Sequence, residues 1–143
     1  MELPGIGKGP LPYDMFDLVR DADAARRAEK LANLYHRGQD LIWSGRKVLP
    51  ELLAKHGGVK LAEPQRSALG SVLNILMWGE LAAWKIAAQL ADSLVPLEVK
   101  LAATAQAHDE ARHFYVFVDY LRELGITPTP LTRRTRLLLD SAL

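Results

Sequence analysis

The chain has 143 residues, of which 49% are hydrophobic and 24% charged, and its formal net charge is +1. That length suits one domain with one core, and the balance is that of an ordinary globular protein. The near-neutral charge gives no strong attraction to nucleic acid or to an anionic membrane, so we expect neither as a partner. The absence of cysteine excludes disulfides, cysteine-bound zinc and iron–sulfur clusters, and it is consistent with a cytoplasmic location.

The N-terminal segment differs from the rest of the chain. Residues 1–13 contain three prolines and three glycines, which predicts an extended arm. The segment lacks the basic and apolar regions of a signal peptide. We expect a single helical domain over residues 14–143.

The first predicted helix covers residues 14–36, where apolar residues recur at helical spacing. Pro50 is then expected to start a further turn that runs to His56. The pair Gly57 and Gly58 should stop it. No stretch shows the alternation of a strand, so the predicted class is all-α.

Two long helices are predicted over residues 64–92 and 96–124, each with proline at its first position. Gly125 is a suitable C-terminal cap for the second helix. A short basic helix should follow over residues 131–143. The apolar stretch 69–91 contains charged residues, which favours a buried amphipathic helix over a membrane span.

Two glycines, Gly70 and Gly79, lie inside the first long helix. Each costs about 1 kcal/mol relative to alanine in a helix interior. Close contact with another helix would explain both.

Glu80, on the first long helix, shares its face with apolar residues. At about 100° per residue that face also carries Leu73, Leu76, Met77, Trp84 and Ala87. An unpaired carboxylate in such a face is costly to bury, so Glu80 needs a proton, a cationic partner or a metal ion.

Glu110 and His113, on the second long helix, are three residues apart and share a face. That face also carries Ala103, Gln106, Ala107, Phe114, Phe117 and Leu121. The turn centres near Val95, with Glu80 fifteen residues before it and Glu110 fifteen after it. In an antiparallel pair, both carboxylates therefore lie at the same height, roughly 22 Å from the turn at about 1.5 Å per residue.

This donor set predicts a metal centre. A carboxylate-rich, sulfur-free set suits iron, with manganese as the alternative, better than structural zinc. Two other interpretations remain open. Glu80 could instead pair with an arginine in the core, and His113 could bond a backbone carbonyl.

A glutamate followed about thirty residues later by Glu-x-x-His on an antiparallel helix resembles half of the site of ferritin-like di-iron carboxylate proteins. The run Asp109-Glu110-Ala111-Arg112-His113 is similar to the Asp-Glu-x-Arg-His run of their oxidase branch. That branch contains the ribonucleotide reductase small subunit, its ligand-binding oxidase relatives, bacterial multicomponent monooxygenases and amine N-oxygenases. The resemblance covers residues 64–124 and implies a ferritin-like antiparallel helical bundle.

The resemblance also implies roles for individual residues. Glu80 would be a terminal or bridging metal ligand, Glu110 a bridging one and His113 a terminal one. Asp109 and Arg112 would hydrogen-bond ligands of the opposite half-site, the alternative being a solvated ion pair. Residues expected near the site, as cavity walls or core, are Met77, Trp84, Gln106, Phe114 and Phe117.

The family pattern requires a second glutamate and a second Glu-x-x-His, which this sequence does not contain. Three sources could supply them: a second copy, as in encapsulated ferritins, a different subunit, or a further part of a longer protein. The first functional hypothesis is therefore an O₂-activating di-iron oxidase or monooxygenase acting on a small organic substrate. The alternatives are a homodimeric ferroxidase and a non-enzymatic helical interaction module.

Overall fold

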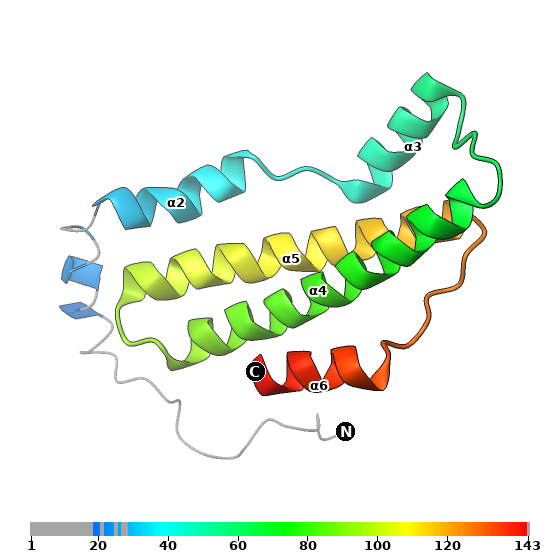
Figure 1. Ribbon diagram of the computed structural model, residues 1–143. Coiled ribbons are helices and arrows are strands. Elements are labelled where there is room, and N and C mark those ends of the chain that lie inside the picture. Colours follow the sequence, from blue (N-terminus) through cyan, green and yellow to red (C-terminus); the bar gives the residue numbers. More distant parts are fainter. Residues whose placement is uncertain (1–18, 21, 25, 27–28, 143) are drawn as a thin grey trace, which may run out of the picture.

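The computed structural model describes residues 19–20, 22–24, 26 and 29–142, and over these it is all-α, without strands. Its helices are α2 (Glu29–Asp40), α3 (Gly45–His56), α4 (Gln65–Ser93), α5 (Leu97–Glu123) and α6 (Arg133–Ala142) (Figure 1). The arm expected at residues 1–13 lies outside the described residues. Among the described helices, none is long and apolar enough to cross a membrane.

Helices α4 and α5 form an antiparallel hairpin that makes most of the contacts between elements (Figure 1). Pro64 and Pro96 occupy the two N-cap positions, one residue earlier than predicted for a first helical residue. At the other end of α5, Gly125 has a φ of 70°, a left-handed conformation that glycine adopts without strain. The predicted helix pair is therefore confirmed to within about one residue at its ends.

The start of α3 differs from the prediction. The helix begins at Gly45, so Pro50 lies inside it and does not start it. A Cβ atom at Gly45 would lie 2.6 Å from Cγ2 of Val116, which shows how closely this first turn approaches α5. The tertiary contact thus outweighs the hydrogen bond that proline removes within the helix. The predicted end is confirmed, because Gly57 follows α3 with a φ of 71°.

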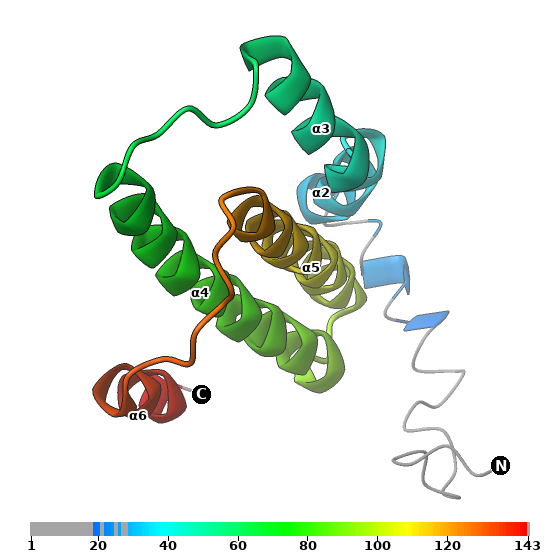
Figure 2. The ribbon, with the colours of Figure 1, turned by 90° about the vertical axis from the view of Figure 1, so that its right-hand side faces the viewer.

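The shorter helices flank the hairpin on two sides. Both α2 and α3 pack against α5, and α2 extends past its predicted end to Asp40. Figure 2 shows α6 on the other side of the molecule, beside α4. The segment leading to α6 is tied to α4, because the Trp78 Nε1 atom donates to the Thr129 carbonyl oxygen at 2.9 Å. Asn74 adds two further bonds to the Thr129 backbone.

The core of the described chain is small and lies between α4 and α5. Its buried apolar residues are Leu73, Met77, Ala87, Leu121 and Leu124. Gly70 lies against Ile126, where an added Cβ would come within 2.1 Å of Cδ1. Ile126 belongs to the segment that follows α5, so the close contact at Gly70 is with this segment and not with the expected helix. At Gly79 an added Cβ meets nothing within 4 Å, so the described residues supply no close helix contact at this position.

Candidate metal centre

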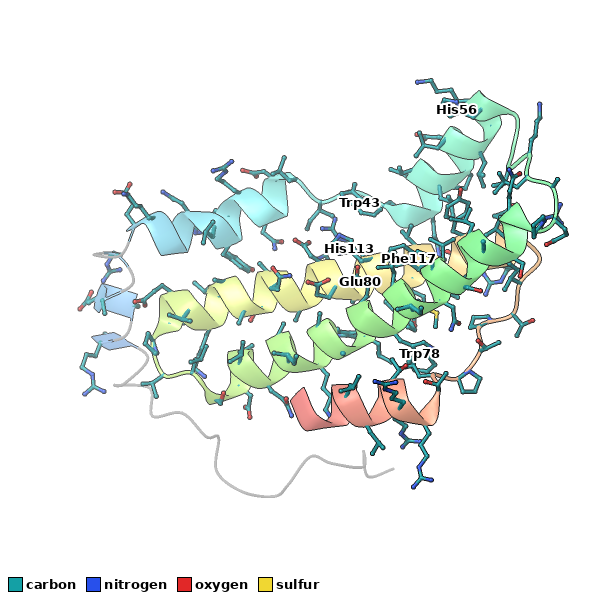
Figure 3. The ribbon with its side chains drawn as sticks, in the orientation of Figure 1. Trp43, His56, Trp78, Glu80, His113 and Phe117 are labelled. Atoms are coloured by element: carbon teal, nitrogen blue, oxygen red, sulfur yellow. The ribbon has the colours of Figure 1, made fainter. Side chains whose placement is uncertain are left out.

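The side chains of Glu80, Glu110 and His113 meet between α4 and α5 (Figure 3). Each offers one ligand atom, and these atoms lie within 4.8 Å of one another. The hairpin causes this meeting, since its turn lies midway between the two carboxylates along the chain. Two carboxylates and one imidazole at such distances can hold a metal ion with hard or borderline character, such as Fe(II) or Mn(II).

The three groups differ in exposure. The Nδ1 atom of His113 lies 3.2 Å from Oε2 of Glu110 and 3.6 Å from Oε2 of Glu80. The side chain of Glu110 is 11% exposed, that of Glu80 23% and that of His113 40%. The site is therefore closed around Glu110 and open at the imidazole, where further ligands or a substrate can approach.

The pKa values of Glu80 and Glu110 shift in opposite directions. Burial raises the pKa of Glu80 to about 7, and the hydrogen bond and negative charge of Glu110 add to this rise. Burial also acts to raise the pKa of Glu110, but hydrogen bonds with Glu80, His113 and Gln106 outweigh it and lower that pKa. In the metal-free protein Glu80 therefore keeps its proton at pH values below about 7, next to the ionised Glu110. A bound cation would displace that proton.

This arrangement predicts how the stability of metal-free protein depends on pH. A carboxyl group with a raised pKa stabilises the folded state while protonated, so the contribution of Glu80 is complete below about 4.5 and lost as pH rises through about 7. The pKa of Glu110 is lowered, so the stability that Glu110 contributes is present above the ordinary pKa of a glutamate and is lost only at lower pH. Chelator-treated protein should lose on the order of 2 kcal/mol of unfolding free energy between pH 5 and pH 8.

Urea unfolding at several pH values measures this loss. The Glu80→Gln variant, which cannot ionise there, should show a markedly flatter profile over the same range. An equal slope in both proteins would contradict the assignment of the proton to Glu80.

Several of the residues predicted near the site do lie beside it. Gln106 Nε2 donates to Oε1 of Glu110 and so fixes the second oxygen of that carboxylate. Met77 is buried in the core, and Phe117 packs against the same cluster. The rings of Trp84 and Phe114, one from each helix of the hairpin, lie with centroids 6.4 Å apart and are tilted by 50°. These aromatic side chains give the hairpin an apolar lining next to the carboxylates.

Trp43, in the loop between α2 and α3, is a site residue that the sequence analysis missed. Its indole stacks on the imidazole of His113, with centroids 6.1 Å apart and an interplanar angle of 28° (Figure 3). The guanidinium carbon of Arg112 lies 5.1 Å from the centre of the indole ring, a cation–π distance. A tryptophan seventy residues before the histidine has no spacing signal, so only the fold could reveal it.

The interaction between Asp109 and Arg112 exists as an i,i+3 ion pair. Arg112 is not solvated, however, since its Nη1 atom donates to the Trp43 carbonyl oxygen at 3.2 Å. Its Nε atom is buried and has no hydrogen-bond partner within the described part of the chain. The pair therefore holds the Trp43 loop against α5. Contact with a second half-site stays a prediction.

Removing the Trp43 ring should weaken metal binding, because this ring orients the imidazole of His113. Trp43→Ala frees the exposed imidazole to rotate, and we expect a roughly tenfold loss of Fe(II) or Mn(II) affinity, as for other residues that orient ligands. Trp43→Phe keeps a stacking ring and should retain most of the affinity. Calorimetric metal titration measures both variants, and equal affinity in wild type and Trp43→Ala would contradict an orienting role.

Comparisons with models of protein families, with curated proteins and with solved structures gave no match for this chain.

Proposed function

We propose that this chain carries half of a carboxylate-bridged di-iron centre that activates O₂, in an oxidase or monooxygenase built on a ferritin-like helical bundle. One observation carries the proposal: two carboxylates and an imidazole from the antiparallel helices α4 and α5 lie within 4.8 Å of one another. Their order, a glutamate and then Glu-x-x-His, is the order that the family resemblance assigns to half a site. Manganese is the alternative metal.

The residues of the chain have distinct tasks in this proposal. Glu80 and Glu110 hold the ions and balance their charge, and Glu80 gives up its proton when the metal arrives. His113 supplies the neutral nitrogen ligand, oriented by Trp43. When bound, the iron pair would supply the electrons that reduce O₂. The aromatic side chains of Trp84 and Phe114 would offer apolar contacts to a small organic substrate.

Oxygen consumption tests this function. The protein is loaded with Fe(II) without air, its iron content is measured, and O₂ and a reductant are added under an oxygen electrode. Wild type should take up O₂ in repeated turnovers, and Glu80→Ala should not. Iron bound at the expected stoichiometry with no O₂ uptake would refute O₂ activation.

A ferroxidase is the second candidate, because His113 is 40% exposed and the site is open to incoming Fe(II) as a substrate. The two candidates differ in the fate of added iron. A ferroxidase oxidises many more Fe(II) ions than it binds and needs no added reductant or organic substrate. Counting Fe(III) formed per chain under O₂ therefore separates them.

A further inference from the structure

Helix α4 carries an aliphatic stripe that is largely exposed in the described part of the chain. The residues of this stripe are Ala68, Val72, Ile75, Leu76, Gly79, Ala83, Ile86 and Leu90. They recur every three or four residues, so they share one face of the helix over roughly 33 Å at about 1.5 Å per residue. The five large members are 38–59% exposed, and the stripe contains no polar residue. An apolar surface of this size and uniformity marks an interaction site.

Gly79, at the middle of the α4 stripe, indicates what covers it. Glycine is unfavourable inside an exposed helix, and an added Cβ at this position meets nothing within 4 Å among the described residues. Gly70, on the same helix, differs because Ile126 of the chain itself lies against it. A glycine amid aliphatic side chains lets the backbone of another helix approach closely. Gly79 therefore marks the point where such a helix crosses α4.

We propose that the α4 stripe binds α4 of a second copy of this chain, antiparallel, with the two-fold axis passing close to Gly79. The stripe is symmetric about this residue: Val72 and Ile86 lie seven residues to either side, and Ala68 and Leu90 lie eleven to either side. Ile75 and Ala83 lie four residues to either side, so in an antiparallel pair the side chains of these three pairs meet those of the other copy. The stripe carries no charge, and its residues pair with those of a second stripe. It is therefore complementary to itself, as a two-fold interface requires.

The same pairing completes the metal centre, and in this respect it rests on the proposed function. Leu76 and Ala83 of the stripe lie four residues before and three after Glu80, so the stripe borders Glu80 on the helix surface. A two-fold axis that runs in the interface, perpendicular to both helices, keeps the Glu80 side chains of both copies on the same side of the pair. Glu110 and His113 of each copy lie beside its own Glu80, so each copy brings three ligands to that side of the pair.

Sedimentation equilibrium of the full chain, first treated with a chelator, tests the surface. Wild type should be a dimer. Ile86→Glu and Gly79→Leu should each raise the dimer dissociation constant by at least roughly 30-fold, the effect of a central interface residue. The matched control is Lys85→Glu, an exposed position next to Ile86 but outside the stripe, which should leave the constant unchanged. Circular dichroism checks that each variant keeps its helix content.

A monomeric wild type, or variants of the stripe that dimerise as wild type does, would overturn the proposal. Metal analysis of the same samples keeps this result separate from the proposed function. Glu80→Ala should remain a dimer without metal, and wild type should bind one pair of ions per two chains. A dimer that binds no metal would refute the metal centre and leave the interface standing. A monomer that binds metal would refute the interface and leave the metal centre standing.

Discussion

Glu110→Ala is expected to lower the affinity of the chain for Fe(II) or Mn(II) by at least about 100-fold, more than the loss of a residue that only orients a ligand. Glu110 is the most buried of the three ligands, and it contacts both others. Gln106 also donates to it, so its position is fixed before a metal binds. Alanine would remove this carboxylate and leave only Glu80 and His113 of the three ligands.

Glu98→Ala provides a matched control for this variant. Glu98 is also a buried glutamate of α5, twelve residues before Glu110 and close to the turn. Among the described residues its Oε2 atom has no hydrogen-bond partner, and Glu98 is not part of the ligand cluster. Metal titration with a fluorescent competitor should show near-wild-type affinity for Glu98→Ala. If both variants lost the same metal affinity, the loss would come from removing any buried carboxylate of α5 and not from removing a ligand of this site.

The hairpin and its three candidate ligands could be predicted because local rules decide them. Proline and glycine set the ends of α4 and α5, and the helical period places Glu80, Glu110 and His113 on the facing sides. The short turn then fixes the register between the helices. Each step depends on residues close in sequence or on one antiparallel pairing.

The contacts that the prediction missed depend on tertiary structure. The approach of Gly45 to Val116 moves the start of α3 upstream of Pro50, and no propensity of the segment itself contains that contact. Trp43 reaches His113 only because α2 and α3 both pack on α5 and the loop between them crosses the site. Gly79 was expected to contact another helix, and none of the described helices lies against it.

Leu121→Ala is expected to lower the unfolding free energy of metal-free protein by about 3 kcal/mol, within the range for a fully buried leucine that leaves a cavity. Leu121 is fully buried and packs in one cluster with Leu73 and Met77 of α4. Partly buried side chains, including Phe114 and Phe117, pack against this cluster, so truncating Leu121 removes contacts on several sides. Leu52→Ala, at an exposed leucine of α3, should change stability by less than about 0.5 kcal/mol in the same urea titration.

The Leu121 variant also tests whether metal binding and the core stabilise the same helix pair. Leu121 lies eight residues beyond His113 on α5, so the cluster clamps the hairpin on the side of the site away from the turn. Ions that bind only the folded protein add stability by mass action, so Fe(II) or Mn(II) should restore part of the loss. A loss below about 1 kcal/mol would contradict the packing of α4 on α5 through Leu121. No restoration by metal would mean that the ions do not bind across the hairpin.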